Sequence, residues 1–393
     1  GLEDRALPHD DREALARYLN LGADFRYNLT SALTAQAAIQ PDFGQVELDP
    51  AVLNLSPFET FFPEKRPFFV EGARFFEHPS FRLFHSRRIG TDEPGNRLRA
   101  AAKLTGKLGP STSIGVLGAF SDVVHPEATH NLLKRGERET GYAVARTTHE
   151  FADGKHRVGF MGTGVWRQVD PDATTPRRDA YSGGADWELN LGDREWRVAG
   201  SMAYTVVDPH RLGDVDPGLQ EGSAGTLDLR RTSGDWRGGV TGSYKSDRFD
   251  PNDIGFLSAN DEVYTRAWLQ YRHDADGAGS RLKASHVYLQ VHRSWLYGEQ
   301  RQVDPLTGGL LWDHAGGHPQ GAGVYLESWN QTHGYQELRC EASLDLAGTS
   351  KYATRAFDGR RGPLMSTPRR GEVELRWQSD WRRDLVGSVE AEI

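Results

Sequence analysis

The segment WELNLGDREWRVAGSMAYTV (187–206) carries the clearest structural signal in this chain of 393 residues. Before a turn at Gly192 and Asp193, one side carries Trp187, Leu189 and Leu191, and the other carries Glu188 and Asn190. After the turn, one side carries Trp196, Val198, Met202, Tyr204 and Val206, and the other carries Arg197, Ser201 and Thr205. A period of two residues around a short turn predicts a β-hairpin with one apolar and one polar face.

The same pattern recurs along most of the chain. It is clear at LDLRRTSGDWRGGVTGSYK (227–245) and again near the end, at 373–393. Less regular hairpins are predicted at 97–122, 139–168, 262–294 and 323–347, with one opening strand near 21–38. These segments predict roughly 14 to 16 strands of about ten residues, the length of strands that cross an outer membrane.

The connections between the predicted strands alternate in length. Tight turns are expected at 192–195, 232–235 and 274–277, and long polar loops at 169–180, 207–222, 246–261 and 295–322. Short turns at one end and long loops at the other are typical of outer-membrane barrels, where the short turns face the periplasm.

Two further features favour a membrane location for these hairpins. Aromatic residues fall near predicted strand ends, as in an interfacial girdle; they are Trp166, Trp187, Trp196, Trp236, Trp377 and Tyr244. Charged residues on the polar face suit a wet interior better than a dry core. A soluble β-sandwich or propeller stays open, because alternation alone does not exclude it. Against it stand the many long hairpins, the glycines within the apolar stripes and the lack of a propeller-length repeat.

Composition excludes several classes of protein and site. The longest stretch without Asp, Glu, Lys or Arg runs from Tyr27 to Pro41, too short and too polar for a membrane-spanning helix. Cys340 is the only cysteine, so no disulfide or cysteine-built metal centre can form within the chain. A net charge of −8 with both signs interspersed argues against a nucleic-acid partner. We expect no cofactor and no metal site.

Residues 40–90 interrupt the alternation with many phenylalanines, prolines and charges. The aromatic side chains demand burial, whereas the prolines oppose a regular strand or helix. We therefore expect an irregular plug-like segment inside the barrel, because a barrel of this size is too wide to be filled by its wall side chains. The candidate lumen or plug residues are Phe58, Glu59, Phe61, Phe62, Glu64, Lys65, Arg66, Phe68, Phe69, Glu71, Arg87 and Arg88.

The chain resembles a bacterial outer-membrane family catalogued as domain of unknown function 5916. The resemblance rests on four stretches in family order: QPDFGQVELDPAVLNLSPFETFFPEKRPFFVEG (40–72), LFHSRRIG (83–90), AAKLTGKLG (101–109) and FDPNDIGFLSAND (249–261). It implies an outer-membrane β-barrel behind a family-9-type (DOMON-like) carbohydrate-binding domain, and it implies no reaction. That domain does not precede residue 1, so we expect the chain to be part of a longer protein.

These observations predict an all-β fold: a transmembrane antiparallel up-and-down barrel over 21–393, preceded by a linker or short helix at 1–20. The leading hypothesis is a barrel in lipid of the outer membrane that binds or passes a solute, with a saccharide as the candidate ligand. One alternative is a surface-exposed carbohydrate-active hydrolase, and another is a structural scaffold for partner proteins. We assign no catalytic residue.

Several smaller features leave the choice between function and structure open. The charges within 40–90 either select a solute or brace a plug against the wall. Acidic residues for glycosidase chemistry are present by type only: Asp42, Glu47, Asp49, Glu59 and Glu64. Asp-rich loops at 170–176, 214–218 and 249–255 suit plain turns as well as Ca²⁺. His125 and His130 have no third ligand in the sequence, so we predict no transition-metal site there.

Overall fold

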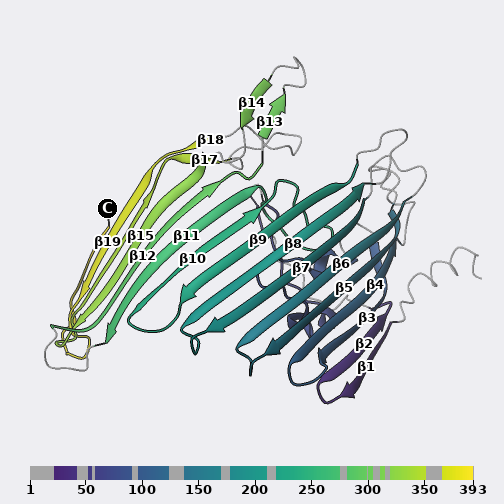
Figure 1. The fold of residues 1–393 in the computed structure, drawn as a ribbon, viewed down its shortest axis with the longest axis horizontal. Coiled ribbons are helices and arrows are strands. Elements are labelled where there is room, and N and C mark those ends of the chain that lie inside the picture. Colours follow the sequence, from purple (N-terminus) through teal and green to yellow (C-terminus); the bar gives the residue numbers. More distant parts are fainter. Residues whose placement is uncertain are drawn as a thin grey trace, which may run out of the picture.

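The computed structural model describes most of the chain, and its dominant feature is one large antiparallel sheet of 16 strands (Figure 1). The described residues are 22–41, 52–54, 58–90, 96–123, 137–169, 178–209, 218–274, 281–298, 300–303, 310–314, 319–350 and 365–392. Residues 1–20, His125 and His130 lie outside them, as do the loop 170–176 and most of 214–218.

The strands of this sheet, called the wall below, follow one another in chain order. They are β1 (Ala23–Thr30), β2 (Leu33–Ile39), β3 (Asn96–Lys107), β4 (Thr112–Val123), β5 (Glu137–Phe151), β6 (His156–Val169), β7 (Arg178–Leu191), β8 (Trp196–Pro209), β9 (Gln220–Arg231), β10 (Trp236–Lys245), β11 (Glu262–Asp274), β12 (Leu282–Trp295), β15 (Pro319–Thr332), β16 (Glu337–Asp345), β19 (Arg370–Gln378) and β20 (Ser388–Glu392). Each strand pairs antiparallel with its neighbour, which is the predicted up-and-down topology.

Two pairs of short strands lie outside the wall. They are β13 (Gln300–Val303) with β14 (Leu310–His314), and β17 (Gly348–Ser350) with β18 (Met365–Thr367). The region 295–322, predicted as one long loop, therefore contains a small hairpin of its own.

The hairpin at 187–206 has the predicted register. Leu191 lies opposite Trp196, and the pairing continues without a bulge to Arg178 and Pro209. The turn uses positive φ angles at Gly192, Asp193 and Arg194 (55°, 51° and 71°). Such left-handed turn conformations match the twist of the two strands.

The opening strand predicted at 21–38 is wrong in detail. This stretch forms two strands, β1 and β2, joined by a tight turn at Ser31 and Ala32. The backbone N–H of Ala32 donates to Oγ1 of Thr30 at 3.1 Å, so a threonine side chain supports the turn. No glycine, proline or asparagine marks the turn residues themselves, and the sequence pattern therefore gave too few strands here.

The wall has an apolar outer face that is open to its surroundings. Exposed outward residues include Phe160 (59%), Trp196 (42%), Leu227 (55%), Trp236 (52%) and Val240 (57%). A soluble sandwich would have buried these side chains in a dry core, and they are not buried. Among the described residues, no helix is long and apolar enough to span a membrane.

Glycines in the outer stripes make room for aromatic rings. A Cβ atom on Gly200 would lie 2.1 Å from the Trp187 ring, and one on Gly225 would lie 2.6 Å from the Tyr244 ring. Each ring therefore lies flat across the neighbouring strand. This contact explains why small residues interrupt the predicted apolar stripes.

Candidate functional site

The irregular segment at residues 58–90, called the inner segment below, lies against the polar face of the wall, behind the strands in the view of Figure 1. It contains three short helical turns, α2 (Pro67–Val70), η1 (Ala73–Phe76) and η2 (Ser86–Arg88). Its buried phenylalanines form one core with wall residues of β3 to β9; they are Phe69, Phe76 and Phe81. Burial of these rings supplies most of the driving force that holds the segment in place.

A buried ion pair gives the inner segment its own internal frame. The Arg66 guanidinium contacts both carboxylate oxygens of Glu64, at 2.9 and 2.7 Å, and donates to the carbonyl oxygens of Ser86 (2.6 Å) and Ile89 (2.7 Å). The Ser86 hydroxyl also donates to Glu64, at 2.6 Å. Burial by itself would raise the pKa of Glu64, but the hydrogen bonds and charge of Arg66 lower it to about 2.

The stretch around α2 in the inner segment is bound by the first three strands. The Lys103 ammonium, on β3, donates to the carbonyl oxygens of Phe68 and Glu71. The Glu71 carboxylate in turn contacts Arg26 on β1 and Gln36 on β2. A charged wall residue therefore closes the C-terminal end of α2, where carbonyl groups need donors.

A buried cluster of three ionisable groups lies between the inner segment and the wall. Arg146 (β5) and Asp186 (β7) form an ion pair of 2.5 Å, with side chains only 4% and 1% exposed. Nε2 of His78, from the inner segment, lies 3.9 Å from the same Asp186 carboxylate. Gly159 leaves the space that this ion pair occupies, and Gly184 does the same for His78 and Leu83.

The histidine in this cluster is held neutral. Burial lowers the pKa of His78 to about 4; Asp186 opposes that shift and Arg146 adds to it. Nδ1 accepts the backbone N–H groups of Ser80 (3.4 Å) and Phe81 (3.2 Å), which places the proton of the neutral ring on Nε2.

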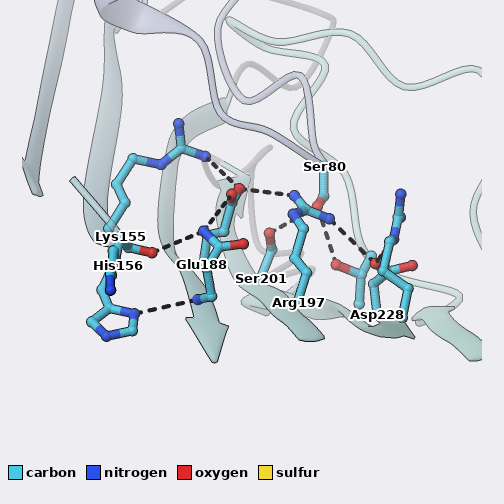
Figure 2. A network of polar contacts seen from close by, with 11 residues as sticks. Ser80, Lys155, His156, Glu188, Arg197, Ser201 and Asp228 are labelled. Carbon is cyan, nitrogen blue, oxygen red and sulfur yellow. Dashed lines mark hydrogen bonds and ion pairs between the residues drawn. The ribbon is translucent and has the colours of Figure 1, made fainter. Parts of the chain in front are cut away.

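Ser80, called the tip of the inner segment below, contacts the wall through neutral hydroxyl groups. Ser80 Oγ lies 2.8 Å from Ser201 Oγ on β8 and 3.1 Å from Thr226 Oγ1 on β9. Figure 2 shows these contacts beside a row of wall charges in which Arg197 bridges Glu188 (2.8 Å) and Asp228 (3.3 Å).

This row of charges extends to both sides along the wall. Arg157 on β6 reaches Glu188 at 3.6 Å, and Arg230 and Thr241 reach Asp228 at 2.6 and 2.8 Å. The charges lie between the tip of the inner segment and the short turns of the wall. Alternating signs keep the row nearly neutral while it remains wet and polar.

The loop at 246–261 folds inward and covers the other side of the inner segment. The backbone N–H of His85 donates to Ile254 O at 2.7 Å, and the N–H of Phe256 donates to Arg82 O at 2.9 Å. Asp253 pairs with Arg167 on β6 at 2.9 Å. In the described part of the chain, no group of three or more His, Cys, Asp or Glu side chains could hold a metal ion.

A cavity of about 1660 Å³ lies between the inner segment and the wall. Charged side chains line it from both sides; on the wall they are Lys107, Arg146, Arg157 and Lys245, and on the inner segment they include Glu71, Arg74, Glu77 and Arg82. Wall hydroxyl groups of Thr34, Ser113, Thr148, Thr226 and Ser243 also line it, and the apolar part of the lining includes Phe61, Phe69, Phe75, Phe76, Phe81 and Phe84. The arrangement suits an organic solute that has both polar and apolar faces.

The candidate residues predicted from the sequence contact three parts of the structure: the inner segment itself, the wall, and loop 246–261. Glu59 pairs with Arg88 at 2.7 Å inside the segment, whereas Glu71 reaches the wall. Phe61 contacts His85 and Phe256, with ring centroids 4.9 and 5.1 Å apart.

The other predicted residues lie close to these. The Arg87 guanidinium is 5.9 Å from the Phe62 ring, the Phe68 and Phe69 rings meet edge to face at 5.0 Å, and Lys65 N–H donates to Glu64 at 3.0 Å. The carbonyl oxygen of Phe58 accepts from Asn54 at 2.6 Å.

Sequence reasoning missed the wall residues that hold the inner segment, chiefly Lys103, Arg146 and Asp186. A signal was present, because each of these charges occupies an inward position beside small residues, as in AAAKLTG (100–106) and SGGADWE (182–188). A charge surrounded by glycine and alanine on a strand indicates that another segment packs there.

A family model and several solved structures match the chain. A family model described as Domain of unknown function (DUF5916) matches residues 6–304. Among solved structures, the siderophore receptor PirA from Acinetobacter baumannii is 8% identical, with 94% of this chain and 72% of that chain covered and a TM-score of 0.32. A mutant ferric enterobactin receptor (PfeA) from Pseudomonas aeruginosa is 11% identical, with 95% and 72% covered and a TM-score of 0.31. No curated protein matches the chain.

Proposed function

The chain belongs to the family described as Domain of unknown function (DUF5916), and from this premise we propose that it is an outer-membrane barrel wall that binds or passes a solute. The apolar outer face supports a location in lipid, because Trp196 (42%), Trp236 (52%) and Leu227 (55%) are exposed on it. The polar inner face supports a hydrated interior.

The observation that carries the proposal is the cavity between the inner segment and the wall, which has charged, hydroxyl-bearing and aromatic side chains in its lining. It combines charged and hydroxyl-bearing side chains in a space large enough for an organic solute. The inner segment contacts this space along most of its length. Its position therefore decides whether a solute can move along the wall.

The tip of the segment is the part best suited to move. The neutral hydrogen bonds of Ser80 with Ser201 and Thr226 contribute about 1 kcal/mol each, and exchange with water offsets part of that. Exposing the buried rings of Phe69, Phe76 and Phe81 would cost several times more. We infer that the tip moves while the rest of the segment stays docked.

The solute class that we propose is a saccharide. The hydroxyl groups of Thr148, Thr226 and Ser243 in the cavity lining support this choice, because they can exchange hydrogen bonds with sugar hydroxyls. Among the acidic candidates for hydrolysis that the structure describes, Glu64 is the one most firmly held by neighbouring groups. The carboxylate of Glu64 is bound by Arg66 and Ser86 with a pKa of about 2, so it is not available as a general acid.

The proposal is tested by a reversible lock on the tip. Ser80→Cys combined with Ser201→Cys, in a Cys340→Ser background, places two thiols where hydroxyl oxygens are 2.8 Å apart. In planar bilayers we expect the oxidised protein to show reduced ion conductance and reduced entry of oligosaccharides into liposomes. Reduction of the disulfide should restore both.

The matched control is a disulfide that joins two adjacent wall strands away from the inner segment. Ser285 and Asn330 are opposite each other on β12 and β15 and suit this purpose. Equal conductance of the oxidised and reduced tip-locked protein would show that the solute path does not run past the tip. If neither the wild type nor the reduced protein passes ions or sugars, a transport role is wrong.

A further inference from the structure

The wall beyond β10 presents a different interior from the part that the inner segment covers. The core formed with the inner segment takes its wall residues from β3, β4, β5, β6, β8 and β9. On β11, β12 and β15 the inward side chains include Trp268, Tyr288 and Tyr325, which alternate with the exposed outward residues Leu269 (47%), Leu289 (41%) and Val324 (42%). These three aromatic residues are half-buried.

The three aromatic residues form a continuous surface across adjacent strands, called the aromatic platform below. The Trp268 and Tyr288 ring centroids are 5.9 Å apart, with only 28° between the ring planes. The Tyr288 and Tyr325 centroids are 6.2 Å apart at 61°. One strand contributes each ring, so the platform runs around the wall at mid-height rather than along a strand.

A glycine on the neighbouring strand leaves room for the first ring. A Cβ atom on Gly239, on β10, would lie 2.8 Å from Nε1 of Trp268 and 2.9 Å from the carbonyl oxygen of Leu229. The indole therefore lies across the position of a missing side chain.

Planar polar side chains surround the platform. Gln290 Oε1 accepts the Tyr288 hydroxyl at 2.9 Å, and Gln270 Nε2 lies 2.6 Å from His286 Nε2. The Tyr325 hydroxyl lies 3.3 Å from Glu341 and 3.4 Å from Glu327. Amide and carboxylate groups of this kind bind pairs of neighbouring hydroxyls on a ligand.

Carboxylates continue past the platform at the same height. Glu327 is opposite Glu341, and Glu341 is opposite Glu374, on β15, β16 and β19. Arg339 and Arg376 lie among them and balance part of the charge, with Arg339 Nε 2.7 Å from Glu341. The three carboxylates outnumber the two guanidinium groups, so an anionic ligand is disfavoured at the Tyr325 end of the platform.

We propose that the aromatic platform binds an uncharged saccharide chain, a site that rests on the proposed passage of solute through the interior. The rings of Trp268, Tyr288 and Tyr325 stack on the apolar C–H faces of successive pyranose units. The side chains of Gln270, Gln290 and Glu327 exchange hydrogen bonds with the ring hydroxyls. The acidic row disfavours uronic or sulfated sugars.

The test measures binding in detergent by calorimetry and blockage of current in planar bilayers. The probes are four uncharged hexasaccharides, maltohexaose, cellohexaose, laminarihexaose and xylohexaose, with hexagalacturonate as the anionic comparison. We expect at least one uncharged probe to bind and to block current, and hexagalacturonate to bind at least tenfold more weakly. Trp268→Ala should weaken binding of that probe at least tenfold.

Two variants separate lost stacking from damaged folding. Trp268→Phe keeps a ring over Gly239 and should retain binding within about threefold, since an aromatic face remains. Trp236→Ala removes a tryptophan from the outer face and should leave binding unchanged. Equal losses in Trp268→Ala and Trp236→Ala would overturn the site.

The outcomes for this site and for the proposed function are distinguishable. If the channel conducts ions but none of the four uncharged probes binds or blocks, the site is wrong and the solute path stands. If a probe binds in detergent with the predicted dependence on Trp268 but no current or sugar entry occurs, the site stands and transport is wrong.

Discussion

The two halves of the wall share one strand pattern but have different interiors. From β3 to β10 the inward positions are rich in glycine and other small residues, and the inner segment packs on them. From β11 to β20 the inward positions carry large aromatic side chains, glutamines and glutamates. Side-chain size on the inner face, rather than alternation, therefore decides where the inner segment can dock.

Glycine at three inward positions allows the close approach. A Cβ atom on Gly115 would lie 2.8 Å from Phe75 O, one on Gly184 would lie 2.7 Å from Leu83, and one on Gly222 would lie 2.3 Å from the Phe249 backbone. Backbone atoms of the inner segment and of loop 246–261 thus come within reach of the strand backbone itself. The later half has no such covering segment in the described residues, and its rings occupy the corresponding layer.

The largest effect on the free energy of unfolding is expected at the most deeply buried ion pair of the covered half. Asp186→Ala leaves the Arg146 guanidinium buried without its carboxylate, and we expect a loss of about 3 to 5 kcal/mol in the free energy of unfolding. Urea unfolding in detergent, followed by tryptophan fluorescence, measures it. The double change Asp186→Leu with Arg146→Met should lose less, because neither charge is then left alone. A larger loss in the double variant would contradict this account.

The next largest effect tests the close approach. Gly222→Ala forces a Cβ atom against the Phe249 backbone, which cannot give way as a flexible side chain would. Overpacking of this kind typically costs about 1 to 3 kcal/mol. Gly242→Ala is the matched control, because a Cβ atom at Gly242 meets nothing within 4 Å. Equal unfolding midpoints for the two variants would show that loop 246–261 does not press on the wall.

Low pH should weaken docking of the inner segment in the covered half and leave the later strands unchanged. Burial lowers the pKa of His78 to about 4 and that of His85 to about 4, where Arg88 and Arg82 add to the effect. A released segment would take up protons near the usual value of 6.5, whereas the docked one resists them. Docking is therefore strongest above pH 6.5 and weakens as the pH falls toward 4.

Hydrogen exchange at pH 7.0, 5.5 and 4.5, corrected for intrinsic rates, measures this weakening. Protection should fall first in residues 67–88, while the strands β11 and β12 stay protected. Replacing His78 and His85 by Gln should flatten the dependence between pH 6.5 and 4.5. If the segment and the later strands lose protection together, these histidines do not control docking.

The smallest effect is expected in the uncovered half. Arg339 pairs with Glu341 at 2.7 Å, but its side chain is 44% exposed. Arg339→Ala should therefore change the free energy of unfolding by about 1 kcal/mol or less. The same urea titration as for Asp186→Ala provides the comparison. A loss as large as that of Asp186→Ala would mean that the two interiors do not differ as described.

Most of the wall was predictable from local pattern. The alternation around Gly192 fixed the register of β7 and β8, and the exposed outer tryptophans agree with it. The split of 21–38 into two strands was not predictable, because a threonine side chain rather than a glycine supports that turn. Alternation with a period of two residues identifies the two faces of a strand, but it says little about where the chain turns back.

The candidate site was predictable in part. Phenylalanine and proline content marked residues 40–90 as a packed irregular segment, and charge density marked Glu64 and Arg66. Sequence could not pair Lys103 with the carbonyl groups of Phe68 and Glu71, nor bring His78 to Asp186. These residues are far apart in the chain, and no local periodicity links a plug residue to a wall residue.

The amino-acid order alone determined the strands, their two faces and the need to bury an aromatic segment, because these follow from hydrophobicity and backbone geometry over a few residues. Tertiary structure decided which half of the wall the segment covers, which charges it buries, and which aromatic rings are left facing the interior. The physical reason is that docking depends on the fit between surfaces from distant strands, where a single Cβ atom, as at Gly222 or Gly239, changes what can approach.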